Sequence, residues 1–152
     1  MNELLMADAE IAPFLFLWHG PVDPLALDEW IARLGIVVPD ELRDLWIRTG
    51  GGEMFEGEDI LRPILTANMD HTVDGVERAN EWYRTQGLSS EHLLFETGAF
   101  VAAVRQRDGA IVDLDSNTFE EREAFATLSE WYLKTERDEF AQRYGLPSAG
   151  ES

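Results

Sequence analysis

Two short apolar runs around one turn signal constrain the fold of this chain most. Residues 100–114 contain two runs rich in valine, alanine and isoleucine, and Asp108-Gly109 lies between them. Asp-Gly is a preferred pair for the two-residue type I′ turn, because both central residues of that turn have a positive φ. A further strand is expected at residues 93–96. Strands that are neighbours in sequence usually pair antiparallel, so the pattern predicts an antiparallel sheet.

Two helices are expected in the first third of the chain. Asp23-Pro24 supplies an N-cap acceptor followed by proline at the first helical position, and Gly35 ends that helix. The second helix opens at Pro39, and the glycines at 50–52 stop it and reverse the chain. A strand-like stretch follows these glycines.

Two more helices are expected later in the chain. One is predicted over residues 74–86, and a closing helix runs from about Leu128 towards Tyr144, with room for a kink. Thr127 and Glu130 match a capping box at its start. This order of elements, with helices first, a meander in the middle and a helix at the end, predicts the α+β class. We expect an antiparallel β-sheet meander packed against several α-helices.

The apolar faces of these elements should meet in one core. Short apolar runs are compatible with either a strand or a helix end, so residues 2–18 are left open between the two. The residues expected in the core are Trp30, Ile31, Leu45, Trp46, Val104, Ile111 and Trp131.

Length and composition indicate a single domain. The chain has 152 residues, 45% of them hydrophobic and none of them cysteine, so we expect one domain over residues 1–147 and a short flexible tail over residues 148–152. The absence of cysteine excludes disulfides, thiol nucleophiles and cysteine-based metal sites. The apolar start of the chain lacks the basic residues of a signal peptide, and no run approaches the roughly 20 apolar residues of a membrane span. We therefore expect a cytoplasmic protein.

The net charge of the chain limits the classes of molecule that it is expected to bind. Twelve basic residues against thirty acidic ones give a formal net charge of −18. Such a field repels nucleic acid and anionic lipid and attracts cationic molecules. Solubility or adaptation to high salt would produce the same composition, and that alternative stays open. We expect a protein partner, and neither nucleic acid nor membrane.

The residues that could hold a metal are too scattered to predict a site. His19, His71 and His92 form no helical ligand pair. The aspartates from residue 113 resemble the start of a calcium loop, but Thr118 stands where that loop needs glycine and Ala124 where it needs glutamate. We therefore predict no metal or cofactor.

No motif for catalysis is found either. The glycines at 50–52 follow a helix and precede Glu53, so they lack the lysine and the helix of a phosphate loop. No serine lies in a nucleophile elbow. A hydrolase built on two carboxylates remains the enzymatic alternative, because thirty acids offer many pairs. The expectation is a protein without catalytic residues.

The densest acidic run is the predicted partner-binding surface. Glu53, Glu56, Glu58 and Asp59 put four acids in seven residues, and Phe55 lies among them. A loop or strand that pairs acids with exposed apolar groups can serve as a contact surface. The alternative is that Phe55 turns inward and the acids are merely solvated.

The chain also resembles a known family. Residues 34–43, LGIVVPDELR, and residues 49–53, TGGGE, are similar to the LG…LP helix start and the later NGG stop of the SUKH superfamily, the Smi/Knr-like proteins. The sequence LFETG at residues 94–98, the Asp-Gly pair and an aromatic-rich closing helix that includes Phe125 also fit.

The resemblance implies an α+β domain without an active site. In bacteria it most often implies an immunity protein that neutralises a toxin by direct binding, here a cationic toxin domain such as a nuclease. Eukaryotic relatives imply the alternative, a regulatory or scaffold adaptor that binds an endogenous partner. The family's variable partner surface gives no contact positions to transfer.

Overall fold

The structure, a computed structural model, describes residues 1–69 and 74–148. The expected position of His71 and most of the expected tail at 148–152 lie outside the described residues. The strands are β1 Phe16–Trp18, β2 Gly52–Met54, β3 Glu58–Ile60, β4 His92–Thr97, β5 Val101–Arg105, β6 Ile111–Leu114 and β7 Glu121–Phe125. The helical segments are α1 Glu3–Ile11, η1 Pro13–Leu15, α2 Pro24–Leu34, α3 Asp40–Thr49, η2 Ala67–Met69, α4 Val76–Thr85, α5 Leu128–Tyr132, η3 Leu133–Arg137 and α6 Asp138–Phe140.

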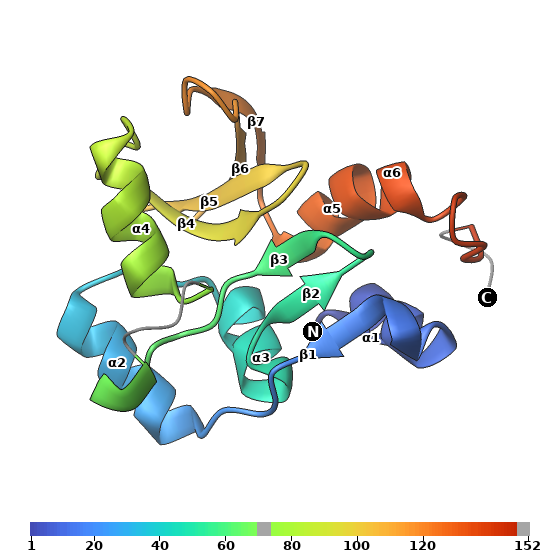
Figure 1. The fold of residues 1–152 in the computed structure, drawn as a ribbon, viewed down its shortest axis with the longest axis horizontal. Helices are drawn as coiled ribbons and strands as arrows, with labels where there is room; N and C mark the ends of the chain where they lie inside the picture. Colours follow the sequence, from blue (N-terminus) through green and yellow to red (C-terminus); the bar gives the residue numbers. More distant parts are fainter. Residues whose placement is uncertain (70–73, 149–152) are drawn as a thin grey trace.

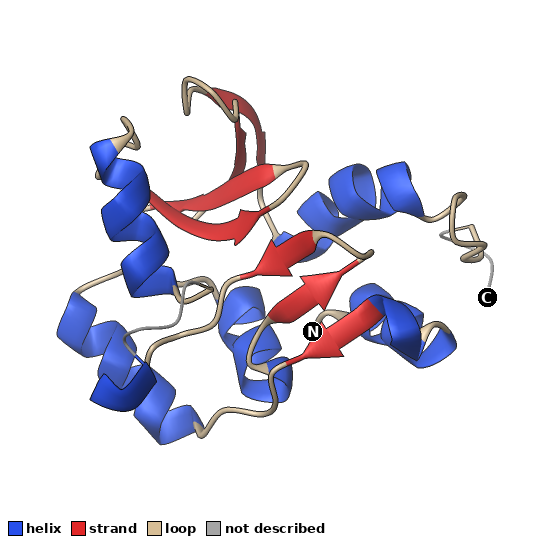
Figure 2. Cartoon of the chain, in the orientation of Figure 1, coloured by secondary structure: helices blue, strands red, loops and turns tan. Residues whose placement is uncertain are grey.

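The strands form one antiparallel meander, so the predicted α+β class is confirmed. All seven pair in sequence order, and β1 and β7 are the two edges of an open sheet. Figure 1 shows that the sheet twists strongly between its β1–β3 part and the β6–β7 part, which is seen nearly edge-on. The helices gather around the strands, with α4 beside β4 and the closing helix beside the sheet on the other side of the view (Figure 2).

Helices cover both faces of the middle of the sheet. On one face, the Asn80 side chain of α4 donates to the carbonyl of Leu94 at 2.9 Å and accepts from the Leu94 N–H at 2.7 Å. On the other face, Trp131 of α5 packs edge-on against Phe95 and donates to Asp113 at 2.9 Å. The face that α4 covers continues onto β1–β3, where its side chains are partly or fully exposed.

The predicted helix ends are confirmed at several positions. Asp23 accepts a hydrogen bond from the N–H of Ala26 at 2.9 Å, and Thr127 accepts from the N–H of Glu130 at 3.1 Å. Gly35 ends α2 with a φ of 64°, a left-handed conformation that suits a residue without a Cβ.

The hairpin between β5 and β6 is also confirmed, but its predicted turn is wrong. The N–H of Arg105 donates to the carbonyl of Ala110 at 2.8 Å, so the loop has four residues, 106–109, instead of two. Among these four, Gly109 alone has a positive φ, of 77°. Asp108 keeps an ordinary backbone because its carboxylate accepts from the Arg105 guanidinium and from the N–H of Ala110.

Other boundaries differ from the sequence interpretation. The strand-like stretch after the glycines is a hairpin, β2–β3, because the chain reverses at residues 55–57. Phe125 ends strand β7 and does not belong to the closing helix. The residues left open at the N-terminus form both elements, α1 and then β1.

The hydrophobic core contains most of the expected residues. Of the seven, Ile31 is partly exposed and packs against the core, and the other six are buried. Trp46 is fully buried, its Nε1 donates to the carbonyl of Leu61 at 2.8 Å, and its ring meets Trp30 edge-on at 5.7 Å. No helix in the described residues has the length and apolarity needed to cross a membrane.

We predict that Trp46→Ala lowers the free energy of unfolding by about 3–5 kcal/mol, because it opens a cavity and leaves the Leu61 carbonyl without its donor. Urea unfolding followed by circular dichroism measures the loss. The matched control is Trp82→Ala, since Trp82 is 58% exposed and its removal should cost less than about 1 kcal/mol. Equal losses in the two variants would contradict the assigned core.

Candidate functional site

Strand pairing divides the acidic run between two faces of the sheet. Glu53 and Asp59 are directly opposite each other in the β2–β3 ladder, and both are half-buried. Leu17 of β1 pairs with Glu53, and Thr97 of β4 pairs with Asp59. Directly paired residues share a face, so these four residues form one cross-strand row, which we call the outer row.

Two of the predicted partner-binding residues lie in the interior instead. Phe55 and Glu58 are 3% and 1% exposed. Glu58 points inward because it lies two residues from the buried Ile60 in β3, and alternate strand residues share a face. The expectation that Phe55 and Glu58 contact a partner through their side chains is therefore corrected. Glu56, at the exposed turn, stays accessible together with Glu53 and Asp59.

The inward position of Phe55 follows from the turn that it occupies. Phe55 and Glu56 have φ values of 49° and 62°, and the N–H of Gly57 donates to the Met54 carbonyl at 3.2 Å, as in a type I′ turn. A positive φ costs on the order of 1–3 kcal/mol in a residue with a bulky side chain. Aromatic packing offsets this cost, because the Phe55 ring contacts Phe140 at 5.1 Å, Phe16 at 5.2 Å and Tyr144 at 6.0 Å.

Glu58 meets two further glutamates in the interior. Glu96 and Glu136 are both 0% exposed, and one carboxylate oxygen from each of the three residues lies within 4.8 Å of the other two. Oε2 of Glu58 accepts from the N–H of Ala99 at 2.8 Å. No described residue outside these three donates to the other five carboxylate oxygens, and Glu96 and Glu136 hydrogen-bond to each other when one of them is protonated. We call these three residues the glutamate triad.

A β-bulge turns Glu96 towards the triad. Leu94 pairs with Ala103, but Glu96 pairs with Ala102, so one extra residue, Phe95, lies between them in β4. Simple alternation from Leu94 would place Glu96 on the face of Ala103, which α4 covers. The extra residue places it on the opposite face, towards the closing helix, as bulges commonly re-aim a side chain.

Glu136 reaches the triad from a π-helical turn, η3, in the closing helix. Such wider turns add one residue to a helical turn and are frequent at functional sites. Here Glu136 and its neighbour Arg137 are both buried. Arg137 binds both carboxylate oxygens of Asp8, at 2.7 and 2.9 Å, and Tyr132 donates to the same carboxylate at 2.7 Å. The positive charge next in sequence to Glu136 is therefore paired with α1.

The surroundings of the triad disfavour negative charge. Burial, followed by the charge of Glu136, raises the pKa of Glu96 well above its ordinary value. Burial and the charges of Glu58 and Asp113 raise the pKa of Glu136 to about 8. Burial also raises the pKa of Glu58, although the Ala99 N–H opposes this shift. Each carboxylate thus lies where a charge needs a compensating proton or cation.

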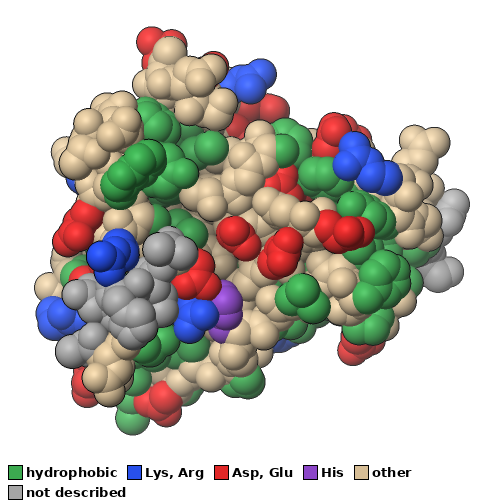
Figure 3. All heavy atoms as spheres, viewed as in Figure 1, with side chains coloured by type: hydrophobic (Ala, Val, Ile, Leu, Met, Phe, Trp, Pro, Cys, Tyr) green, Lys and Arg blue, Asp and Glu red, His purple; other side chains and the backbone are tan. Residues whose placement is uncertain are grey.

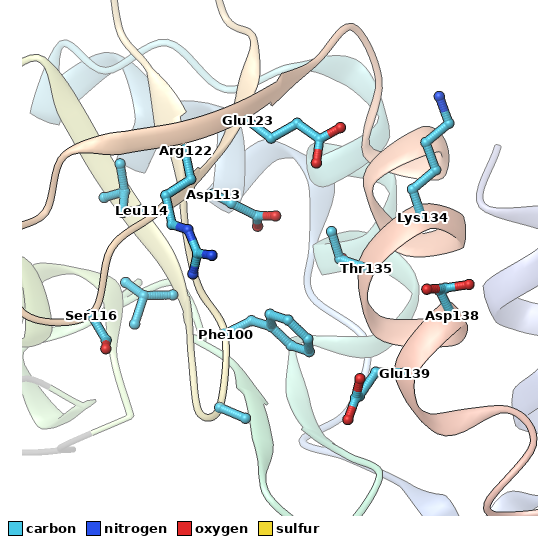
Figure 4. A pocket seen from close by; sticks show the side chains of 12 residues that line it. Phe100, Asp113, Leu114, Ser116, Arg122, Glu123, Lys134, Thr135, Asp138 and Glu139 are labelled. Atoms are coloured by element: carbon cyan, nitrogen blue, oxygen red, sulfur yellow. The ribbon is translucent and has the colours of Figure 1, made fainter.

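A pocket of about 370 Å³ lies between the strands β5–β7 and the closing helix, and the three glutamates are not among its lining residues. In Figure 4, Asp113 from the sheet and Thr135 from the helix extend from opposite walls towards this space. Ala99, which lines the pocket, donates its N–H to Glu58, and Thr135 precedes Glu136 in sequence. Four acids and two bases also line it, namely Asp113, Glu123, Asp138, Glu139, Arg122 and Lys134.

The outer row lies on an acidic part of the surface. Figure 3 shows acidic side chains gathered across the middle of this face, with a histidine beside lysine or arginine next to them. His19 Nε2 lies 2.8 Å from a carboxylate oxygen of Asp74, and Arg62 binds both side chains. Burial, together with the charges of Glu53 and Asp74, raises the pKa of Asp59. The β1–β3 face therefore concentrates negative charge beside one basic pair.

Apolar side chains lie at both ends of the outer row. Leu17 is 59% exposed on the edge strand. At the other end, a pocket of about 330 Å³ between Thr97 and α4 is lined by Leu61 and by Trp82, which is 58% exposed. Exposed apolar groups beside polar ones resemble the apolar core and polar rim of protein–protein interfaces.

The triad was not predicted from the sequence, although signals for two of its members are present. In the closing helix, Trp131, Tyr132, Thr135 and Glu136 follow Leu128 at spacings of three, four, seven and eight, the pattern of a buried helical face. The alternation in β3 likewise predicts that Glu58 faces inward once Ile60 is buried. No comparable signal exists for Glu96, because its direction depends on the bulge.

Comparisons with known proteins found no relative of this chain. No family model matches the chain, and no curated protein is similar to it in sequence.

We predict that the stability of the metal-free protein falls as the pH rises from about 5 towards 8. The folded protein keeps a proton on Glu136 up to about pH 8, whereas the unfolded chain loses it near its ordinary pKa of 4.5. The stabilisation is fully present below pH 4.5 and is lost as the pH passes through 8, with a slope of about 1.4 kcal/mol per pH unit for each retained proton.

Urea unfolding in EDTA at several pH values measures this slope. Glu96, Glu58 and Asp113 are the acids that face Glu136, and all remain in the comparison variant Glu136→Gln. The variant lacks the proton and should show a smaller slope. Identical slopes in the two proteins would contradict the raised pKa.

Proposed function

We propose that this domain is a non-catalytic protein-binding module that captures a basic partner through the outer row. Its most specific form is an immunity protein of the SUKH type, which acts in the cytoplasm and neutralises a cationic toxin domain, such as a nuclease, by direct binding. The observation that carries the proposal is the placement of Glu53 and Asp59 between the exposed Leu17 and the pocket at Trp82. Acids here attract a basic surface, and the apolar ends provide sites for anchoring side chains.

The charge of the whole chain supports the same partner. A net charge of −18 can raise the rate of association with a cationic protein roughly 10- to 10³-fold over an unsteered encounter. Fast capture is what an immunity protein needs, because a toxin acts as soon as it is delivered. Tight binding would still depend on a few buried contacts, because area and charge alone do not give affinity.

The enzymatic alternative gains no support from the closest group of acids. The three glutamates that lie together are 0–1% exposed, so a polymeric substrate has no access to them. A glycosidase needs its two carboxyl groups on either side of a bound sugar. The buried position of the triad instead favours a role inside the protein.

We predict that co-expression of this chain with the toxin encoded beside its gene restores the growth of the host, and that the two proteins co-purify. The control is a chain carrying Glu53→Gln, Glu56→Gln and Asp59→Asn, which should protect less at equal abundance. Failure of the unaltered chain to protect or to bind would contradict the immunity role. Stable binding to an endogenous protein by an isolated gene product would instead favour the adaptor.

We further predict that this triple variant associates with its partner at least about 10-fold more slowly at low ionic strength, because three steering charges are lost. Stopped-flow measurements at rising salt check the result, since the difference should shrink as the Debye length falls below about 8 Å. The matched control removes three exposed acids elsewhere, Glu29, Glu81 and Glu120. A larger loss in this control would place the contact surface elsewhere.

A further inference from the structure

Three buried carboxylates converge from elements that are far apart in sequence. Glu58 comes from the hairpin β2–β3, Glu96 from β4 and Glu136 from the closing helix, and their exposed fractions are 1%, 0% and 0%. One oxygen of each lies within 4.8 Å of the other two. The structure thus brings a formal charge of up to −3 into a region from which water is excluded.

A second observation is that no described residue outside the triad donates to most of its carboxylate oxygens. Both oxygens of Glu96, both of Glu136 and Oε1 of Glu58 are buried without such a donor, and Glu96 and Glu136 hydrogen-bond to each other only when one of them carries a proton. Native proteins rarely leave buried polar atoms unsatisfied, because each one loses its interactions with water at a cost of about 1–3 kcal/mol or more. Arg137, the nearest cation in sequence, is bound to Asp8.

We propose that Glu58, Glu96 and Glu136 bind one hard divalent cation, best matched by calcium, which links the β2–β3 hairpin to β4 and to the closing helix. This inference does not depend on the identity of the protein partner.

The type of donor atom selects this class of ion. The site offers carboxylate oxygens without histidine or cysteine, the ligand type of calcium, manganese and magnesium. Calcium accepts oxygen ligands in a flexible geometry, whereas magnesium demands a near-ideal octahedron and keeps several waters. A buried site built from carboxylates therefore fits calcium better than magnesium.

The number of carboxylate oxygens and the neighbouring acids also suit a divalent ion. Calcium takes six to eight oxygens, and the three carboxylates supply up to six. The three glutamates do not line the pocket of about 370 Å³, but its wall includes Ala99, whose N–H donates to Glu58, and Asp113 and Glu139 place negative charge there. These acids attract a cation towards this side of the triad.

Backbone close to Glu58 supports a fixed position for its carboxylate. A Cβ placed on Gly98 would collide with Oε2 of Glu58, and the φ of Gly98 is +153°. Glycine at position 98 therefore allows the carboxylate to lie against the backbone, where the N–H of Ala99 holds one oxygen. The other oxygen, Oε1, is left without a hydrogen bond and is available to the ion.

The test compares thermal unfolding after treatment with EDTA and then with added calcium, manganese or magnesium. We expect calcium to raise the midpoint of unfolding by about 5–10 °C when its free concentration is about 100 times its Kd, with a smaller rise for magnesium. Isothermal titration should give one ion per chain. Unchanged unfolding with all three ions at millimolar concentration would overturn the proposal and leave a proton shared between the carboxyl groups.

Isosteric variants locate the site. Glu96→Gln and Glu136→Gln each remove one charged ligand and should weaken calcium binding about 100-fold or more, while in EDTA both fold as well as the unaltered protein or better. Glu58→Gln should act in the same way, so three independent variants are available if one fails to fold. The matched control is Glu29→Gln, because Glu29 is exposed on α2. Equal calcium binding by Glu29→Gln, Glu96→Gln and Glu136→Gln would show that exposed acids bind the ion and would overturn the proposal.

Discussion

The two-residue period of strand side chains is the constraint on which the rest of this site depends. Once Ile60 is buried, Glu58 must also point inward, and Asp59 between them must point outward. The ladder carries this division to the neighbouring strands, where Glu53 lies on the outer face and Met54 in the core. A single hairpin therefore presents acids to solvent and places another acid inside the domain.

Each inward glutamate is accompanied by a departure from regular backbone. Glu58 follows a turn with two positive φ values, Glu96 follows a β-bulge, and Glu136 lies in a π-helical turn. Such irregularities persist where the surrounding packing determines them. The packing of Phe55 against the closing helix supplies that support for the hairpin. The same contact keeps the hairpin next to the helix that carries Glu136.

The general fold was readable from the sequence because its signals are local. Asp23, Gly35 and Thr127 act on backbone groups within four residues, so their roles could be predicted from spacing alone. The turn at Asp108 was predicted wrongly, since the Arg105 side chain competes for the aspartate and stabilises a longer loop. The direction of Phe55 depends on aromatic residues about 40 to 90 positions away, which no local pattern reveals. The acidic surface was therefore only partly predictable, and the triad requires the tertiary structure.

The two proposed roles, partner binding by the outer row and cation binding by the glutamate triad, involve opposite faces of the same hairpin. The outer row can change its charges without disturbing the core, because Glu53 and Asp59 pair with each other across the surface of the sheet. A cation on the inner face acts on the same hairpin through Glu58, only one residue from Asp59. Binding there would restrict the hairpin before a partner arrives and reduce the entropy lost when the partner binds. The net charge would change only from −18 to −16 on addition of a divalent ion, so long-range attraction of a basic protein would be largely kept. In this proposal the inner site would hold the shape of the outer surface, while the charges of the outer row would determine which partner approaches it.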